Sequence, residues 1–210
     1  MKAYLVQCLL WLALCLGALA LFNYSADPYG VFHPGHWGAE RINRIDQTWL
    51  MRLTKPWQVK NLKPDAVVIG SSRTGTLSTT AVAWKDQRAF NFSVPGLTPH
   101  EMLRFVMHAQ AQQKLDRLMV GLEYESFLSS TPRVMLGFEP ARLSGQMNQM
   151  SWTERASQFC ADLSTVLLST TATINSFQIL SGDTLPNRTL QADGSWQDQP
   201  LRRSGEAGFV

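Results

Sequence analysis

The sequence predicts an α/β domain with a parallel sheet, preceded by an N-terminal membrane helix. Three observations lead to this fold class. An uncharged apolar run opens the chain. Short strand-like segments recur after residue 63, the first of them β-branched, and a segment with helical spacing separates two of them. Strands and helices that alternate over short links form parallel sheets.

The composition is that of a globular chain with one apolar segment. The 210 residues are 45% apolar and 17% charged, which excludes a disordered, collagenous or low-complexity protein. The net charge of +3 is too weak to predict a nucleic-acid partner. The three cysteines form no Cys-x-x-Cys motif and no Cys/His cluster. We therefore expect no metal site, and no motif predicts a cofactor.

The N-terminal segment, residues 1–22, is predicted to anchor the chain. Tyr4 to Phe22 carries no charge and is long enough to cross a bilayer. Lys2 precedes the run and stays cytoplasmic by the positive-inside rule, so the rest of the chain lies across the membrane. The alternative is a signal peptide cleaved after Ala18-Leu19-Ala20. Because the apolar run continues beyond that site, we favour the anchor.

Residues 23–63 are predicted to be an irregular, membrane-proximal connector. Proline and glycine recur in it, and residues 42–53 have the pattern of a short helix. Six basic residues stand against three acidic ones. Such a segment either touches anionic head groups or forms a solvated helix face, and we favour the solvated face.

Residues 64–180 carry the alternating pattern of the domain. Ala66 to Ile69 predicts a strand buried on both faces, and residues 89–94 and 118–122 predict two more. A helix is expected over 99–113, where Thr98 is the N-cap and Pro99 the first helical residue.

The signal is weaker after residue 127. Ser151 and Glu154 form a capping-box pattern that predicts a helix over 152–168, and 174–180 predicts a short helical piece. Residues 181–210 are rich in loop-forming residue types and are predicted to be a loop-like tail.

The segment with chemical potential is Gly70-Ser71-Ser72-Arg73, directly after the first strand. Residues at this place lie at the carboxyl edge of a parallel sheet, where open α/β sheets bind their ligands. Gly70 permits a sharp turn there. Taken alone, a strand-Gly-Ser segment is more often a structural turn than the site of a nucleophile.

A second segment, Asn91 to Thr98, favours a nucleophile over a purely structural turn. Together the two segments resemble the blocks of the SGNH (GDSL-like) hydrolase superfamily, since Asn91, Gly96 and Thr98 match an Asn-x-x-x-x-Gly-x-Thr block. The resemblance implies a three-layer αβα, flavodoxin-like sheet with Ser72 as nucleophile. The backbone N–H groups of Ser72 and Gly96 would form the oxyanion hole. The neighbouring residues would be Gly70, Ser71, Arg73, Asn91, Thr98 and Glu123.

The order of short motifs narrows the resemblance. The N-terminal anchor is followed, in this order, by the segment Asp27-Pro28-Tyr29-Gly30, the Gly-Ser-Ser-Arg turn and a Val-Gly-Leu-Glu strand. This order resembles membrane-anchored bacterial proteins of cell-envelope and exopolysaccharide gene sets, including the alginate O-acetyltransferase and D-alanyl-transfer (DltD-like) groups. It implies an exported acyl esterase or acyltransferase in the bacterial inner (cytoplasmic) membrane, single-pass, with its C-terminal domain on the periplasmic or extracellular side. The implied partners are the lipid bilayer and a surface glycan or an envelope assembly protein.

Two departures from the superfamily bear on activity. Glu123 stands where the superfamily has an oxyanion-hole Asn, and we expect it either to bind Arg73 or another cation or to face solvent. The chain has no Asp-x-x-His, and its last histidine is His108. We therefore expect an incomplete sheet, a truncated family member and impaired catalysis. The alternatives are a non-catalytic remnant or envelope scaffold and, less favoured, a flavodoxin-like small-molecule binder.

The four histidines are weak candidates for the missing base. His33 and His36 fall in the connector, where a solvated turn is the favoured interpretation. His100 begins a helix beside the Gly96 loop and is favoured as a surface or capping residue over a base. His108 lies two turns further along and is expected on a helix face.

Overall fold

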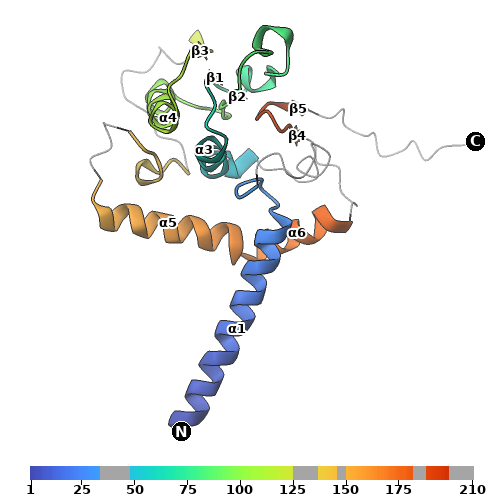
Figure 1. The fold of residues 1–210 in the computed structure, drawn as a ribbon, viewed down its shortest axis with the longest axis vertical. Helices are drawn as coiled ribbons and strands as arrows, with labels where there is room; N and C mark the ends of the chain where they lie inside the picture. Colours follow the sequence, from blue (N-terminus) through green and yellow to red (C-terminus); the bar gives the residue numbers. More distant parts are fainter. Residues whose placement is uncertain (34–47, 125–136, 146–149, 182–187, 199–210) are drawn as a thin grey trace, which may run out of the picture.

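The computed structural model describes residues 1–33, 48–124, 137–145, 150–181 and 188–198 (Figure 1). These residues form a mixed α/β fold with a three-stranded parallel sheet, five α-helices and a separate two-stranded hairpin. In chain order the elements are α1 (Lys2–Ala26), η1 (Thr48–Leu50), α3 (Met51–Leu62), β1 (Ala66–Ile69), η2 (Thr74–Thr76), η3 (Val82–Trp84), β2 (Ala89–Asn91), α4 (Pro99–Gln112), β3 (Arg117–Val120), η5 (Pro140–Arg142), α5 (Trp152–Leu167), α6 (Thr170–Ser181), β4 (Arg188–Leu190) and β5 (Trp196–Asp198).

The parallel sheet has the strand order β2-β1-β3. Val67 of β1 is in register with Phe90 of β2 and with Leu118 of β3. All of β1 is buried, as its continuous β-branched run predicts. The predicted first strand is therefore confirmed. The second is shorter than expected and ends at residue 91, and the third is shifted to 117–120.

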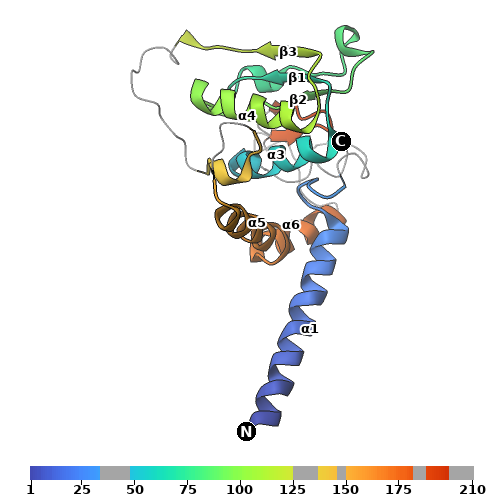
Figure 2. The same cartoon turned by 60° about the vertical axis from the view of Figure 1, so that its left-hand side comes forward.

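Strand β3 is an edge strand with exposed apolar side chains. Leu118, Met119 and Val120 are 42%, 43% and 44% exposed. Successive strand residues point to opposite faces, so apolar surface is exposed on both sides of β3. Figure 2 shows β3 at the end of the domain farthest from the N-terminal end of α1.

The predicted helix caps are confirmed. Thr98 accepts a hydrogen bond from the Glu101 backbone N–H, and the Glu101 carboxylate accepts one from the Thr98 backbone N–H. Ser151 and Glu154 form the same reciprocal pair at the start of α5. Each box satisfies backbone donors that a helix N-terminus leaves unpaired.

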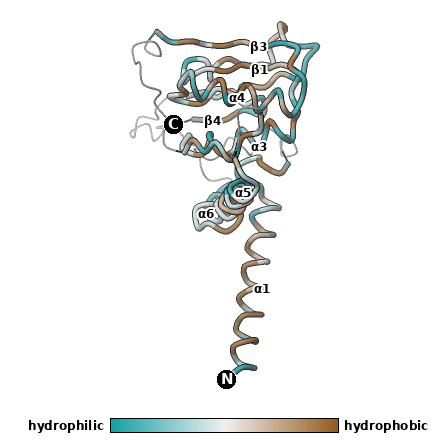
Figure 3. Tube along the Cα trace, turned by 90° about the vertical axis from the view of Figure 1, so that its left-hand side faces the viewer, coloured by the Kyte–Doolittle hydropathy of each residue, from teal (hydrophilic) through white to brown (hydrophobic). Residues whose placement is uncertain are grey.

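Helix α1 is the one helix in the described ranges that is long and apolar enough to cross a membrane. Figure 3 shows α1 extending away from the domain with mostly apolar residues along it. It ends where Asp27 adopts a left-handed conformation with φ 38°. The Asp27 carboxylate then accepts hydrogen bonds from the backbone N–H groups of residues 31–33, which fixes the turn of the Asp-Pro-Tyr-Gly segment. Burial raises the pKa of Asp27, and these hydrogen bonds oppose that shift.

The prediction of an irregular connector is wrong for residues 48–62. Helix α3 begins at Met51, and most of its residues are buried. Met51 and Val59 pack into the main core with the sheet and α4, whereas Leu53 packs into a second core with α5 and α6. The expected helix start, 42–47, lies outside the described residues. Pro56 inside α3 has no N–H to donate to the Arg52 carbonyl. Arg142 donates to that carbonyl instead, at 3.1 Å, so a side chain from another segment completes the helix.

The prediction of a loop-like tail is wrong for residues 188–198, where β4 and β5 form an antiparallel hairpin. Leu190 and Trp196 face each other across it and are fully or nearly fully buried in the main core. Gly194 has φ 80° and donates its N–H to the Gln191 carbonyl, as in a three-residue hairpin loop that ends in a left-handed glycine. The Asp193-Gly194 dipeptide was therefore the overlooked hairpin signal.

The contact between Gly75 and Trp196 can be tested by adding one methyl group. A Cβ at residue 75 would overlap the Trp196 ring, which is completely buried. We expect Gly75→Ala to lower the free energy of unfolding, measured by denaturant titration in micelles, by about 3 kcal/mol. Gly17→Ala is the control, because its Cβ meets nothing within 4 Å, and it should change stability by less than about 1 kcal/mol. Equal effects of the two substitutions would contradict the packing of the hairpin.

Candidate functional site

The candidate site lies where the order of the strands reverses. Strand β1 is central, the chain passes from it to β2 on one side, and α4 then leads to β3 on the other side. Ser71 follows β1, and Glu123 follows β3. Ser71 is buried, and its hydroxyl donates a hydrogen bond to the Glu123 carboxylate, which joins the segments that follow β1 and β3. Open α/β sheets bind ligands where the strand order reverses.

Two glycines permit the close approach of β1 and β3 at the site. A Cβ at Gly70 or at Gly121 would overlap the side chain of Thr74, which is buried between them. The Gly121 N–H donates to the Ile69 carbonyl at 2.7 Å, so the pairing of the strands continues to the edge. This explains why Gly70 stands at the turn, as the sequence indicated.

Ser72 and Arg73 point away from this packing. Both are exposed, and their side chains make no hydrogen bond or ion pair with the rest of the described chain. The expected pair of Arg73 with Glu123 does not form, and the partner of the Glu123 carboxylate is the Ser71 hydroxyl. Ser72 is therefore the accessible hydroxyl of the site, and Ser71 is the structurally engaged one.

The loop of Gly96 lies beside the turn after β1. Val94 donates its N–H to the Gly70 carbonyl at 3.1 Å, which holds the two loops together. Gly96 is exposed with φ 66°, a conformation that favours glycine. Its carbonyl accepts a hydrogen bond from Arg52, which also pairs with the buried Glu101 at 3.2 Å. The sequence pattern missed this ion pair, because Arg52 was assigned to the connector.

Asn91 fixes the shape of the serine loop. Its buried side-chain amide donates to the carbonyls of Thr74 and Leu77, at 3.0 and 2.8 Å, and its side-chain oxygen accepts from the Ser93 N–H. The structure therefore brings Asn91 and the segment 70–77 together, as the sequence predicted, and makes Asn91 a positioning residue. Thr98, in contrast, is engaged as the cap of α4.

Lys55 is completely buried and donates a hydrogen bond to the backbone carbonyl of Asn91. Its ammonium donates to the carbonyls of Asn91, Ser93 and Gly194 at 2.9, 2.6 and 2.7 Å. Three acceptors satisfy all three N–H groups of an ammonium. Burial lowers the pKa of Lys55 well below its usual range, and the Asp193 carboxylate opposes that shift. No sequence pattern distinguished this lysine from the surface lysines of a solvated helix.

The described residues place no imidazole against Ser72. His100 packs its ring edge-on against Phe138, and His33 lies 3.8 Å from the Asp27 carboxylate. His108 lies on the buried face of α4. His36 lies outside the described residues.

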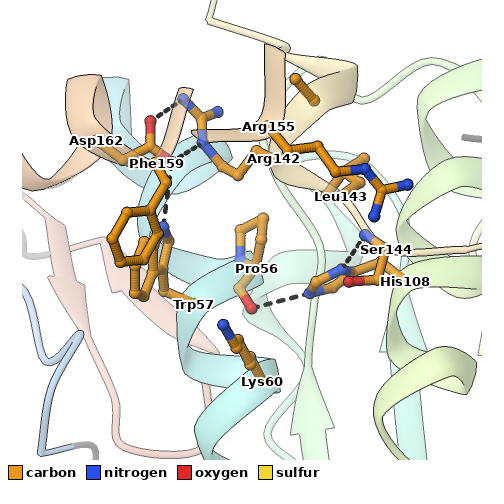
Figure 4. A pocket seen from close by; sticks show the side chains of 11 residues that line it. Pro56, Trp57, Lys60, His108, Arg142, Leu143, Ser144, Arg155, Phe159 and Asp162 are labelled. Atoms are coloured by element: carbon orange, nitrogen blue, oxygen red, sulfur yellow. Dashed lines mark hydrogen bonds and ion pairs between the residues drawn. The ribbon is translucent and has the colours of Figure 1, made fainter. Parts of the chain in front are cut away.

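A pocket of about 160 Å³ lies elsewhere, between α3, α4, α5 and the segment 141–144 (Figure 4). Arg142 and Asp162 form a bidentate ion pair at 2.7 Å on one side of it, and Trp57 stacks on Phe159. His108 lines the other side (Figure 4). None of the predicted site residues lines this pocket, so its position gives no support to chemistry at Ser72.

No group of three metal-ligating side chains occurs within the residues that the structure describes. Comparisons with protein-family models, with curated proteins and with solved structures found no match to this chain. A proposal about function therefore depends on the geometry at the carboxyl edge of the sheet.

His108 gives the fold a testable pH dependence. Its Nδ1 accepts from the Ser144 N–H and its Nε2 faces the Pro56 carbonyl, which defines a neutral ring (Figure 4). Burial lowers the pKa of His108, the Pro56 carbonyl opposes this, and the charge of Lys60 adds to it. Below about pH 6.5 the unfolded chain binds this proton and the folded chain does not, so the free energy of unfolding falls as the pH drops.

We expect the fall in the free energy of unfolding between about pH 7.5 and 5.5 to be lost in His108→Gln and kept in His100→Gln. The measurement is denaturant unfolding at each pH. A His108→Gln variant with the wild-type pH slope would contradict the assignment.

Proposed function

We propose that the chain is a membrane-anchored, exported SGNH-like protein related to acyl esterases and acyltransferases of the bacterial cell envelope. The observation that carries this proposal is the position of Ser71-Ser72 and Glu123 after β1 and β3, where the strand order reverses. Ser72 is the nucleophile of the proposal, and the N–H groups of Ser72 and Gly96 are its oxyanion donors.

The strand order supports the relation to a flavodoxin-like, three-layer sheet. In that fold the first three strands lie in the order 2-1-3, with the ligand at the crevice between strands 1 and 3. The order β2-β1-β3 has the same arrangement. Ser71 and Glu123 follow the two strands that border this crevice.

The chemistry expected of the site is slow acyl transfer. An exposed serine hydroxyl can attack an acyl carbonyl, but it needs a base because its pKa lies far above neutral pH. Ser72 has no imidazole beside it in the described part of the chain, and the Glu123 carboxylate is engaged by Ser71. We therefore propose an impaired activity, directed at acyl groups on or near surface polysaccharide.

Helix α1 is the proposed membrane anchor. Its length and apolar composition fit a single crossing of the inner membrane. Lys2 at its N-terminal end fits a cytoplasmic start, which puts the domain on the periplasmic or extracellular side.

A second candidate function is a non-catalytic envelope scaffold or remnant. The exposed apolar side chains of β3 favour it, since an unpaired edge strand with apolar faces is a surface for binding another protein. In this case Ser72 has no chemical role, and an envelope assembly protein is the partner.

Covalent labelling separates the two candidates. We expect a fluorophosphonate probe to label the wild-type chain in membranes and to label Ser71→Ala, whereas Ser72→Ala loses the label. Ser78→Ala is the matched control, because Ser78 is an exposed serine of the domain whose hydroxyl donates to Asp193 and not to a site residue. Hydrolysis of p-nitrophenyl acetate should follow the labelling.

If Ser72→Ala retains the wild-type labelling and hydrolysis, the enzymatic proposal fails. Capture of an envelope protein by both wild type and Ser72→Ala, with no labelling of either, would support the scaffold.

A further inference from the structure

We propose that α5 and α6 lie flat on the membrane surface, with their outer faces in contact with lipid, beside the point where α1 leaves the bilayer. This inference rests on the proposed anchoring of α1. It assigns a second, in-plane membrane contact to the chain. The domain is thereby oriented on the membrane, where a single helix would allow it to rotate.

The charge pattern of the two helices is the first argument. From Ala156 to Ser181 the chain has one charged residue, Asp162. Asp162 is buried, and Arg142 neutralises it at 2.7 Å. A helix pair on an aqueous surface normally exposes charged side chains opposite its buried face. Glu154 and Arg155 in the first turn of α5 are charged and exposed, but from Ala156 to Ser181 the two helices present an uncharged outer surface.

Exposed apolar side chains are the second argument. On α6, Ile174 and Phe177 are 57% and 61% exposed, and they lie opposite the buried Ala172, Ser176 and Ile179. Trp152 at the start of α5, Leu168 just after its end and Leu180 of α6 are also exposed, whereas Phe159 of α5 faces the domain and stacks on Trp57. An amphipathic helix with aromatic and aliphatic residues on its outer face is typical of an interfacial membrane helix.

The position of the pair relative to α1 identifies lipid as the occupant. Figure 1 shows α5 and α6 crossing the end of α1 at a large angle, between α1 and the rest of the domain, and Figure 2 agrees. The apolar run Tyr4 to Phe22 is about 29 Å long as a helix, close to the thickness of the hydrocarbon core. Phe22 therefore lies at the boundary of that core.

Direct contacts place α6 at the same depth. The rings of Phe22 and Phe177 are 4.8 Å apart. One residue further along α1, the buried Asn23 accepts a hydrogen bond from Ser176 and donates to the Leu167 carbonyl at the end of α5. The outer face of α6 is thus fixed at the level where the apolar span ends. An uncharged apolar face at that level meets lipid.

The test measures the depth of single sites in the full chain, reconstituted in vesicles of phosphatidylcholine and phosphatidylglycerol. Nitroxide labels are placed one at a time in a background without other cysteines. The native Cys15 reports on α1, the native Cys160 on α5, and Ile174→Cys on α6. Leu122→Cys is the matched control, because Leu122 and Ile174 are both 57% exposed and Leu122 follows β3 at the far end of the domain.

We expect the ratio of oxygen to nickel-chelate accessibility to be highest at Cys15. At Cys160 and Ile174→Cys it should be several-fold above that at Leu122→Cys. If Cys160 and Ile174→Cys match the Leu122→Cys control while Cys15 is in lipid, the surface contact is refuted and the anchor stands. If Cys15 is itself aqueous, the anchor fails. If the labels at Cys160 and Ile174→Cys are protected from both oxygen and the nickel chelate, protein covers α5 and α6, which also refutes the lipid contact.

Discussion

The ammonium group of Lys55 is the interaction on which the rest of the domain depends. It joins three segments that are distant in sequence, since α3 donates through it to the end of β2 and to the turn of the β4–β5 hairpin. The faces of Trp196 and Phe90 lie 4.8 and 5.9 Å from it, which adds cation–π attraction to the three hydrogen bonds. Burying a charge is costly unless its donors are satisfied, and here each N–H has a carbonyl acceptor.

Through Asn91, Lys55 also stabilises the loop of the candidate site. Lys55 binds the Asn91 carbonyl, while the Asn91 side chain binds the carbonyls of the loop that follows Ser72. Trp196 packs against Gly75 in the same loop, so the hairpin supports the serine turn from a second direction. The exposure of Ser72 and the engagement of Ser71 by Glu123 thus result from a rigid surrounding. Together with α1 and the α5–α6 pair, this yields a domain whose serine loop has a fixed orientation relative to the proposed membrane surface.

The sequence predicted those parts of the fold whose residues have a local reason for their structure. The apolar run of α1, the β-branched run of β1 and the two capping boxes are local signals, and all appear in the structure. The elements it missed depend on distant partners. Helix α3 continues through Pro56, where Arg142 from a distant segment donates to the free Arg52 carbonyl. Lys55 looks like a solvated lysine, because its acceptors come from residues up to 139 positions away. At the site, Gly70, Ser71 and Glu123 come together, but the partner of Glu123 is Ser71 and not Arg73, which the strand pattern alone does not distinguish.

The most direct test of this account is the stability of Lys55→Met compared with Lys60→Met. Methionine keeps much of the volume of lysine but leaves three buried carbonyls without a donor, whereas Lys60 is exposed on the same helix. The measurement is the free energy of unfolding of the full chain in micelles. We predict that Lys55→Met loses at least about 3 kcal/mol, because each unsatisfied buried group costs about 1–3 kcal/mol. Lys60→Met should change it by less than about 1 kcal/mol. Equal stability of the two variants would contradict the central role of the buried ammonium.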